Sequence, residues 1–104
     1  MPYARINMFE FSTAEERDKN AAKLRNNIKS VFPEIRAFVT METSQTAGLA
    51  ISIYDDKEAA DRALLQRDRH HENTGLVDIV SHEGNVKNFY VEGPHLDLLL
   101  NTGT

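Results

Sequence analysis

The sequence has no cysteine and no tryptophan among its 104 residues. Without cysteine there is no disulfide framework, no thiolate metal site and no cysteine nucleophile. Long apolar runs are also missing, since the longest uninterrupted ones span three or four residues, far short of the roughly 20 that cross a membrane. We therefore expect a soluble, cytoplasmic protein with no membrane partner.

A positive charge excess is absent as well. Twelve Lys and Arg face 16 Asp and Glu, so the formal net charge is −4, and no basic block is present. Binding to a nucleic-acid backbone depends on clustered Lys and Arg. The five glycines form neither G-x-G-x-x-G nor a phosphate loop. We expect no nucleic-acid partner and no bound nucleotide.

Hydrophobic periodicity predicts the first two elements. Strict alternation over YARINMFEF predicts a strand at Tyr3–Phe11. Ser12 and Glu15 then have the spacing of a capping box, which predicts the start of a helix. The apolar stripe of that helix continues to Pro33, which ends it.

The remaining chain predicts a second set of elements. Residues 35–42 and 49–54 alternate again and predict two strands close enough to form a hairpin. Asp55 caps a second helix with a small, alanine-rich face. Residues 70–83 are interpreted as helix, break and short helix, and residues 85–92 as the last strand.

The resulting order, βαββαβ, predicts an α+β ferredoxin-like fold. In this fold, a four-stranded antiparallel sheet carries two helices on one face. Residues 1–104 are expected to form one domain. Its leucine-rich end, residues 93–104, is expected to dock as a C-terminal tail because free termini are usually polar.

Alternation along a strand separates its side chains into two opposite sets. We place the aliphatic set against the helices: Ala4, Ile6, Met8, Leu49, Ile51 and Ile53. The other set then lies on the uncovered face: Arg5, Asn7, Phe9, Phe11, Ala50, Ser52 and Tyr54. Exposed aromatic side chains in this second set would form an interaction patch. We therefore predict a homodimer, or a higher oligomer, that packs sheet on sheet around a cavity.

The segments YARINMFEF, AGLAISIYDDKEAADRALL and SHEGNVKNFYV make the chain resemble the dimeric α+β barrel superfamily, and in it the antibiotic-biosynthesis monooxygenase-like branch. The resemblance implies dimerisation sheet to sheet into a barrel. It also implies one of several activities: oxidation of aromatic substrates by O₂ without an added cofactor, haem degradation or isomerisation. Known sites in this superfamily use an Asn on the first strand, a Trp and a His. Asn7 matches the Asn, and His70 and His71 are the candidates for the His.

Seven residues are the candidate site, each with a structural alternative. Asn7 can orient a substrate oxygen or hydrogen-bond across a dimer interface. Arg5 and Tyr54 can bind an anionic or phenolic ligand, or form an intersubunit ion pair and a satisfied hydroxyl. The catalytic candidates are Asn7, His70 and His71, and the ligand-binding candidates are Arg5, Phe9, Ser52 and Tyr54.

The two adjacent histidines are candidates for a general base or a haem ligand, with a solvated pair as the alternative. Neighbouring residues of a helix point about 100° apart, so we expect only one of the pair to face a site. The pairs His71–Glu72 and His82–Glu83 do not form H-E-x-x-H. We predict no metal site and no cofactor.

Three functions remain open. The first is a cofactor-independent monooxygenase-like enzyme acting on a small aromatic or polyketide-like substrate in the barrel cavity, because an aromatic substrate can activate O₂ once deprotonated. The second is a non-catalytic protein that binds a small molecule or haem in the same cavity. The third is a purely structural oligomer whose aromatic side chains fill the barrel.

Overall fold

The computed structural model describes residues 1–72 and 74–92. Its elements are, in order, β1 (Tyr3–Phe11), α1 (Ala14–Val31), β2 (Ala37–Glu42), β3 (Ala47–Tyr54), α2 (Lys57–His70) and β4 (Leu76–Asn85). The predicted βαββαβ order is confirmed. The predicted docking tail, residues 93–104, lies outside the described residues. In the part of the chain that is described, neither helix is long and apolar enough to cross a bilayer.

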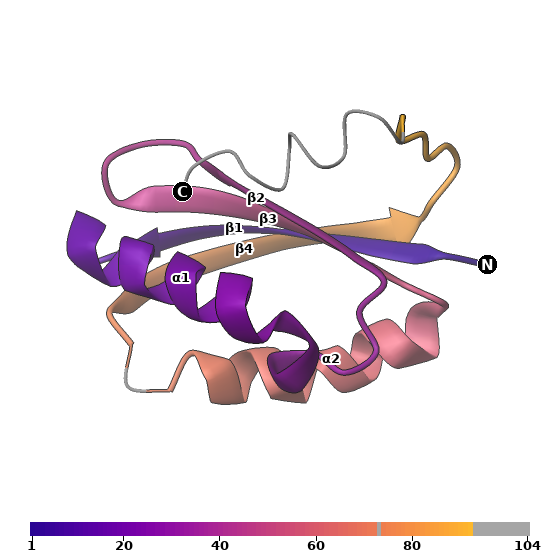
Figure 1. Ribbon diagram of the computed structural model, residues 1–104, viewed down its shortest axis with the longest axis horizontal. Helices are drawn as coiled ribbons and strands as arrows, with labels where there is room; N and C mark the ends of the chain where they lie inside the picture. The colour runs from indigo at the N-terminus through magenta and orange to yellow at the C-terminus, as the bar shows by residue number, and fades with distance from the viewer. Residues whose placement is uncertain (73, 93–104) are drawn as a thin grey trace.

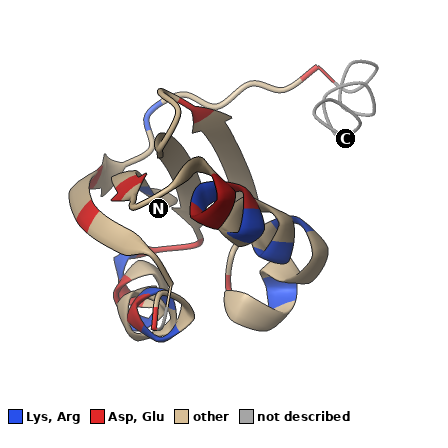
Figure 2. Ribbon diagram, turned by 90° about the vertical axis from the view of Figure 1, so that its left-hand side faces the viewer, with Lys and Arg blue, Asp and Glu red and all other residues tan. Residues whose placement is uncertain are grey.

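The four strands form one antiparallel sheet in the order β2-β3-β1-β4. Both helices lie against the same face of this sheet (Figure 1), and the view turned by 90° shows that the opposite face carries no helix (Figure 2). The charged residues gather on the helices (Figure 2). This is the predicted ferredoxin-like layering, with β1 at the centre of the sheet beside β3 and β4.

Each helix begins one residue later than predicted. Thr13, not Ser12, is the N-cap of α1, and its side chain accepts a hydrogen bond from the backbone N–H of Glu16 at 3.1 Å. Asp56, not Asp55, caps α2 and accepts from the N–H of Ala59 at 2.9 Å. Both cap positions sit in a pair of adjacent capping residues, so the sequence predicts that a helix starts there without deciding between the two.

The interpretation of residues 76–92 is wrong. The last strand is β4, Leu76–Asn85, where a short helix was predicted, and residues 86–92 form no strand. The reason is tertiary pairing: β4 runs beside β1 from Tyr3 opposite Asn85 to Phe11 opposite Leu76. The ladder of backbone hydrogen bonds that β1 offers along its free edge overrides the weak local helical pattern.

The assignment of the two sheet faces is also wrong, because they are reversed. The face against the helices carries the aromatic and polar set, of which Tyr3, Arg5 and Tyr54 are buried. Alternation puts the two sets on opposite faces but does not say which set meets the helices. Packing decides it: the large rings of the sheet fit against the small side chains of α2. The buried core is Tyr3, Leu24, Phe32, Ile35, Tyr54, Ala59, Ala60 and Ala63.

The aliphatic set therefore lies on the face without helices. We call this surface the open face. Met8, Val39, Met41 and Val80 are exposed on it. Strand pairing places them beside four half-buried side chains, so that the aliphatic side chains of the open face are Ile6, Met8, Val39, Met41, Leu49, Ile51, Ile53 and Val80. His82 lies on the same face, opposite Ile6. An aliphatic surface of this extent is typical of an interaction site.

Candidate functional site

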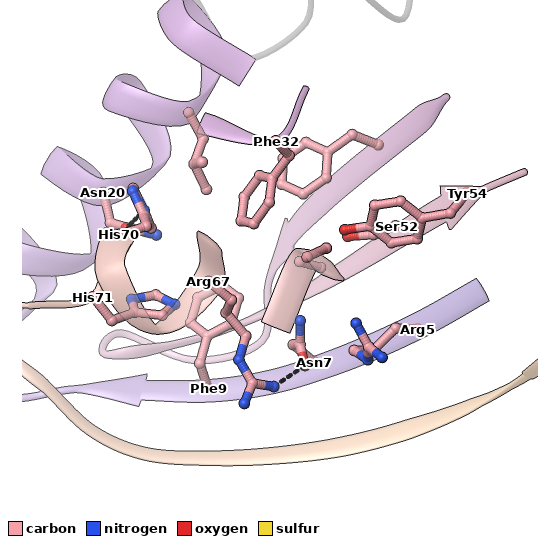
Figure 3. A pocket seen from close by; sticks show the side chains of 14 residues that line it. Arg5, Asn7, Phe9, Asn20, Phe32, Ser52, Tyr54, Arg67, His70 and His71 are labelled. Carbon is pink, nitrogen blue, oxygen red and sulfur yellow. Dashed lines mark hydrogen bonds between the residues drawn. The ribbon is translucent and has the colours of Figure 1, made fainter. Parts of the chain in front are cut away.

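A pocket lies between the sheet and the two helices, and all seven predicted site residues line it (Figure 3). The structure brings these residues together around one pocket, and their roles remain predictions. This pocket lies within one chain, on the helix side of the sheet, whereas the site residues were expected from the sequence on the uncovered face. The pocket is lined by Arg5, Asn7, Phe9, Asn20, Leu24, Phe32, Phe38, Ala50, Ser52, Tyr54, Ala63, Arg67, His70 and His71.

The free space in the pocket is small. Its volume is about 30 Å³, which holds one or two water molecules. Phe9 lines the pocket. Its ring lies over Gly48, where an added Cβ atom would come within 2.7 Å of the ring. A ring-sized ligand therefore needs side chains to move aside. Arg67 lies at the boundary with solvent, with its side chain 19% exposed.

One end of the pocket is closed by an ion pair. Arg5, 2% exposed, donates from Nε to Glu83 at 3.0 Å and from Nη1 to the carbonyl oxygen of Ala60 at 2.7 Å. Tyr3 donates to the same carboxylate at 2.9 Å. Arg5 was predicted to bind a ligand or to form an ion pair between subunits. Its pairing is with Glu83 of its own chain, which links β1 to β4.

Glu83→Gln is expected to lower the free energy of unfolding at pH 7 by about 2 kcal/mol, because it removes the charge that Arg5 pairs with. Hydrogen bonds from Arg5 and Tyr3 hold the pKa of Glu83 below its ordinary value. This contribution is therefore present above about pH 4.5 and is lost as the pH falls through the lower folded-state pKa. Urea unfolding at pH 7 and pH 3 checks both effects. Glu72→Gln, at an exposed site whose side chain has no ion pair within the described residues, is the control, and equal unfolding of Glu83→Gln and wild type at pH 7 would contradict the expectation.

At the other end, His70 is 6% exposed and its Nε2 meets Oδ1 of Asn20, which is also buried. Burial, together with the nearby charges of His71 and Lys23, lowers the pKa of His70 to about 4. A neutral imidazole has one N–H, which in this contact is on Nε2, facing the amide oxygen. Nδ1 of His70 thus carries a lone pair, and it has no hydrogen-bond partner among the described residues.

Both histidines line the pocket, which corrects the expectation that only one would. The two rings are in edge contact, with centroids 4.9 Å apart. Both side chains reach the pocket from the end of α2, although they point in different directions. His70 is buried, so the solvated alternative is wrong for it. Burial lowers the pKa of His71 too, with Arg67 lowering it further and Asp68 opposing the shift. Nδ1 of His71 is buried without a partner in the described ranges.

The middle of the pocket holds a second polar group. Arg67 of α2 donates from Nη1 to Oδ1 of Asn7 at 3.2 Å and to Oγ of Ser81 at 3.1 Å. Ser81 donates in turn to Oδ1 of Asn7 at 2.6 Å. Asn7 and Ser81 are opposite each other in the β1–β4 ladder. The side-chain amide of Asn7 thus hydrogen-bonds both to β4 and to α2.

Three polar residues of this site were not predicted as functional: Asn20, Arg67 and Ser81. Arg67 and Asn20 sit on the buried faces of their helices, and a polar residue on a buried face is a signal that the sequence does contain. No sequence pattern indicated a role for Ser81, because this segment was assigned to a short helix and not to β4. Across residues 1–72 and 74–92, no group of three or more His, Asp or Glu side chains is arranged to hold a metal ion.

Comparison with known proteins shows which solved structures have a similar fold. No protein-family model and no curated protein matches the sequence. Among solved structures, SnoaB, a cofactor-independent oxygenase from Streptomyces nogalater, is 13% identical with a TM-score of 0.63, over 88% of this chain and 98% of that one. A dimeric ferredoxin-like protein from an uncultured marine organism is 11% identical with a TM-score of 0.63, over 88% and 100%. The chain shares the ferredoxin-like α+β fold of these structures.

A third structure of this fold is the monooxygenase ActVA-Orf6 of Streptomyces coelicolor, in complex with the ligand nanaomycin D. It is 10% identical to this chain with a TM-score of 0.62, over 88% of this chain and 92% of that one. The predicted resemblance to antibiotic-biosynthesis monooxygenase-like proteins is thus confirmed for the fold. Dimeric α+β barrels include oxygenases, but a fold hosts many activities, so function must be argued from the pocket.

Proposed function

We propose that this chain is a cofactor-independent monooxygenase-like enzyme that acts on a small aromatic or polyketide-like substrate in the pocket between sheet and helices. The observation that carries the proposal is the pair of adjacent histidines in the pocket, His70 buried and His71 half-buried and both with a lowered pKa, next to the Asn7–Arg67 group. Proton acceptors and a cation in one apolar pocket are the groups that a deprotonated substrate needs. The structural neighbours SnoaB and ActVA-Orf6 support the reaction class.

In the proposed reaction, His71 takes a proton from an acidic CH₂ or phenol group of the substrate. His71 is half-buried and can pass the proton to water, whereas His70 is enclosed and held by Asn20. The positive charge of Arg67 stabilises the resulting anion. O₂ then converts the CH₂ group to C=O: one oxygen atom enters the substrate, the other leaves with the two hydrogens as water. The substrate supplies all the electrons.

Anthrone, which has an acidic CH₂ group between two rings, is a suitable test substrate. We expect the protein to accelerate O₂ uptake, measured with an oxygen electrode, and anthraquinone formation, measured by absorbance. His71→Gln should reduce the protein-dependent rate about a hundredfold if His71 is the general base. Leu65→Gln, on the exposed side of α2, is the control and should keep full activity.

The outcomes separate the candidate functions. O₂ uptake equal to that of buffer, with anthrone bound, would contradict catalysis and favour a protein that stores or senses the ligand. If anthrone does not bind and the rate equals that of buffer, the proposed substrate class is wrong. Because the pocket volume is about 30 Å³, binding of anthrone requires that Arg67 and Phe9 move aside.

We also propose a homodimer that packs through the open face. The open face is aliphatic, has no helix over it and lies on the rigid sheet (Figure 2). The similar structure from a marine organism is described as a dimeric ferredoxin-like protein. A second copy of the chain offers an identical aliphatic surface, as a two-fold interface requires. The proposed dimer interface is thus the aliphatic set, whereas the sequence-based prediction placed the interface on the aromatic set.

A further inference from the structure

The amide of Asn7 has a defined orientation. Arg67 contacts its Oδ1 at 3.2 Å, and a guanidinium group has only donors. The atom facing Arg67 must therefore be the amide oxygen. The hydroxyl of Ser81, which accepts a hydrogen bond from Arg67, donates a hydrogen bond to the same oxygen at 2.6 Å. Both donors thus act on Oδ1 and fix the rotation of the amide.

The NH₂ group of Asn7 then points the other way. Figure 3 shows its nitrogen directed into the pocket, away from the dashed contact to Arg67. Arg5 and Phe9 flank Asn7 on β1, whereas its partner in β3, Ala50, has a small side chain and the small Ala63 of α2 also lines the pocket. The NH₂ group of Asn7, which has two N–H donors, thus faces a part of the pocket that neither Ala50 nor Ala63 fills.

We propose that Arg67 and Ser81 are positioning residues that turn the NH₂ group of Asn7 toward the ligand, and that the ligand presents an acceptor oxygen there, as a ketone or phenolate does. The inference deepens the proposed function by naming the substrate class: an aromatic ring system with an oxygen acceptor. It rests on the proposed pocket, but it does not require that the chain be catalytic.

The test uses two probes that differ by one oxygen. 1-Tetralone carries a ketone beside an aromatic ring, and tetralin has the same skeleton without it. We expect wild-type protein to bind tetralone about fivefold to tenfold more tightly, as one hydrogen bond allows. The side-chain amide protons of Asn7 in a ¹H–¹⁵N spectrum should shift further downfield with tetralone than with tetralin, because only tetralone accepts a hydrogen bond from them.

Variants separate positioning from packing. Asn7→Ala should abolish the preference for tetralone. Arg67→Glu, which presents an acceptor, should rotate the amide of Asn7 and abolish the preference as well, while Arg67→Lys, which still donates, should retain it. A role of Arg67 in packing alone would not distinguish Glu from Lys in this ratio.

Three results would overturn the inference. Equal binding of tetralone and tetralin in the wild type, with both bound, contradicts the donor role of Asn7 but leaves the pocket as a ring-binding site. A preference that persists in Arg67→Glu contradicts positioning by Arg67. Binding of neither probe contradicts both this inference and the proposed pocket.

Discussion

Ile51→Asp is expected to convert the proposed dimer into a folded monomer. Ile51 lies at the centre of the open face, opposite Ile6 on one side and Val39 on the other. An uncompensated carboxylate in an apolar interface costs roughly 3–5 kcal/mol, and the two-fold interface holds two copies. The dissociation constant should therefore rise at least about a hundredfold. Within one subunit the residue is half-buried, so the monomer can keep the carboxylate in contact with water and stay folded.

Sedimentation velocity at micromolar concentration measures this effect. Leu65→Asp is the matched control, because Leu65 is apolar and 71% exposed but lies on α2, away from the open face. It should sediment as the wild type does. A wild-type protein that sediments as a folded monomer, or an Ile51→Asp variant that remains a dimer, would disprove the sheet-to-sheet assembly. Phe9, first expected on this face, packs on the helix side over Gly48 and does not test it.

Acid is expected to destabilise the fold through His70. Its folded-state pKa is about 4, against an ordinary value of 6.5, so the unfolded chain binds this proton first as the pH falls. Stability is thus complete above pH 6.5 and is lost progressively between pH 6.5 and 4. From pH 7 to pH 5 the free energy of unfolding should drop by about 2 kcal/mol on account of His70 alone.

Urea unfolding of wild type and His70→Gln, at pH 7, 6 and 5 and one protein concentration, isolates this contribution. The other histidines are present in both proteins, so their titration cancels in the difference. Carboxylates titrate mainly below this range. We expect the variant to lose about 2 kcal/mol less than the wild type over the two pH units. Parallel pH profiles would mean that His70 is protonated as easily in the folded as in the unfolded chain.

The local sequence predicted most elements because their signals are short-range. The alternation in Tyr3–Phe11, the helical stripes and the capping residues each act within a few positions of the chain, and all of these elements are present. The grouping of Asn7, Arg5, Ser52 and Tyr54 was also predictable. Alternation places all four on one face, and pairing of β1 with β3 brings them together. Composition and periodicity together were therefore enough for the βαββαβ fold and for one side of the pocket.

Tertiary structure alone decided the remaining features. The alternation of side chains along a strand separates two faces but does not decide which face meets the helices. Packing against the alanine face of α2 determined that it is the aromatic set and not the aliphatic set. The strand character of Leu76–Asn85 depends on the free edge of β1. The contacts of Asn20 with His70 and of Arg67 with Asn7 join residues 50 and 60 positions apart. Such contacts exist only after both helices have docked on the sheet, because no local pattern encodes the distance between them.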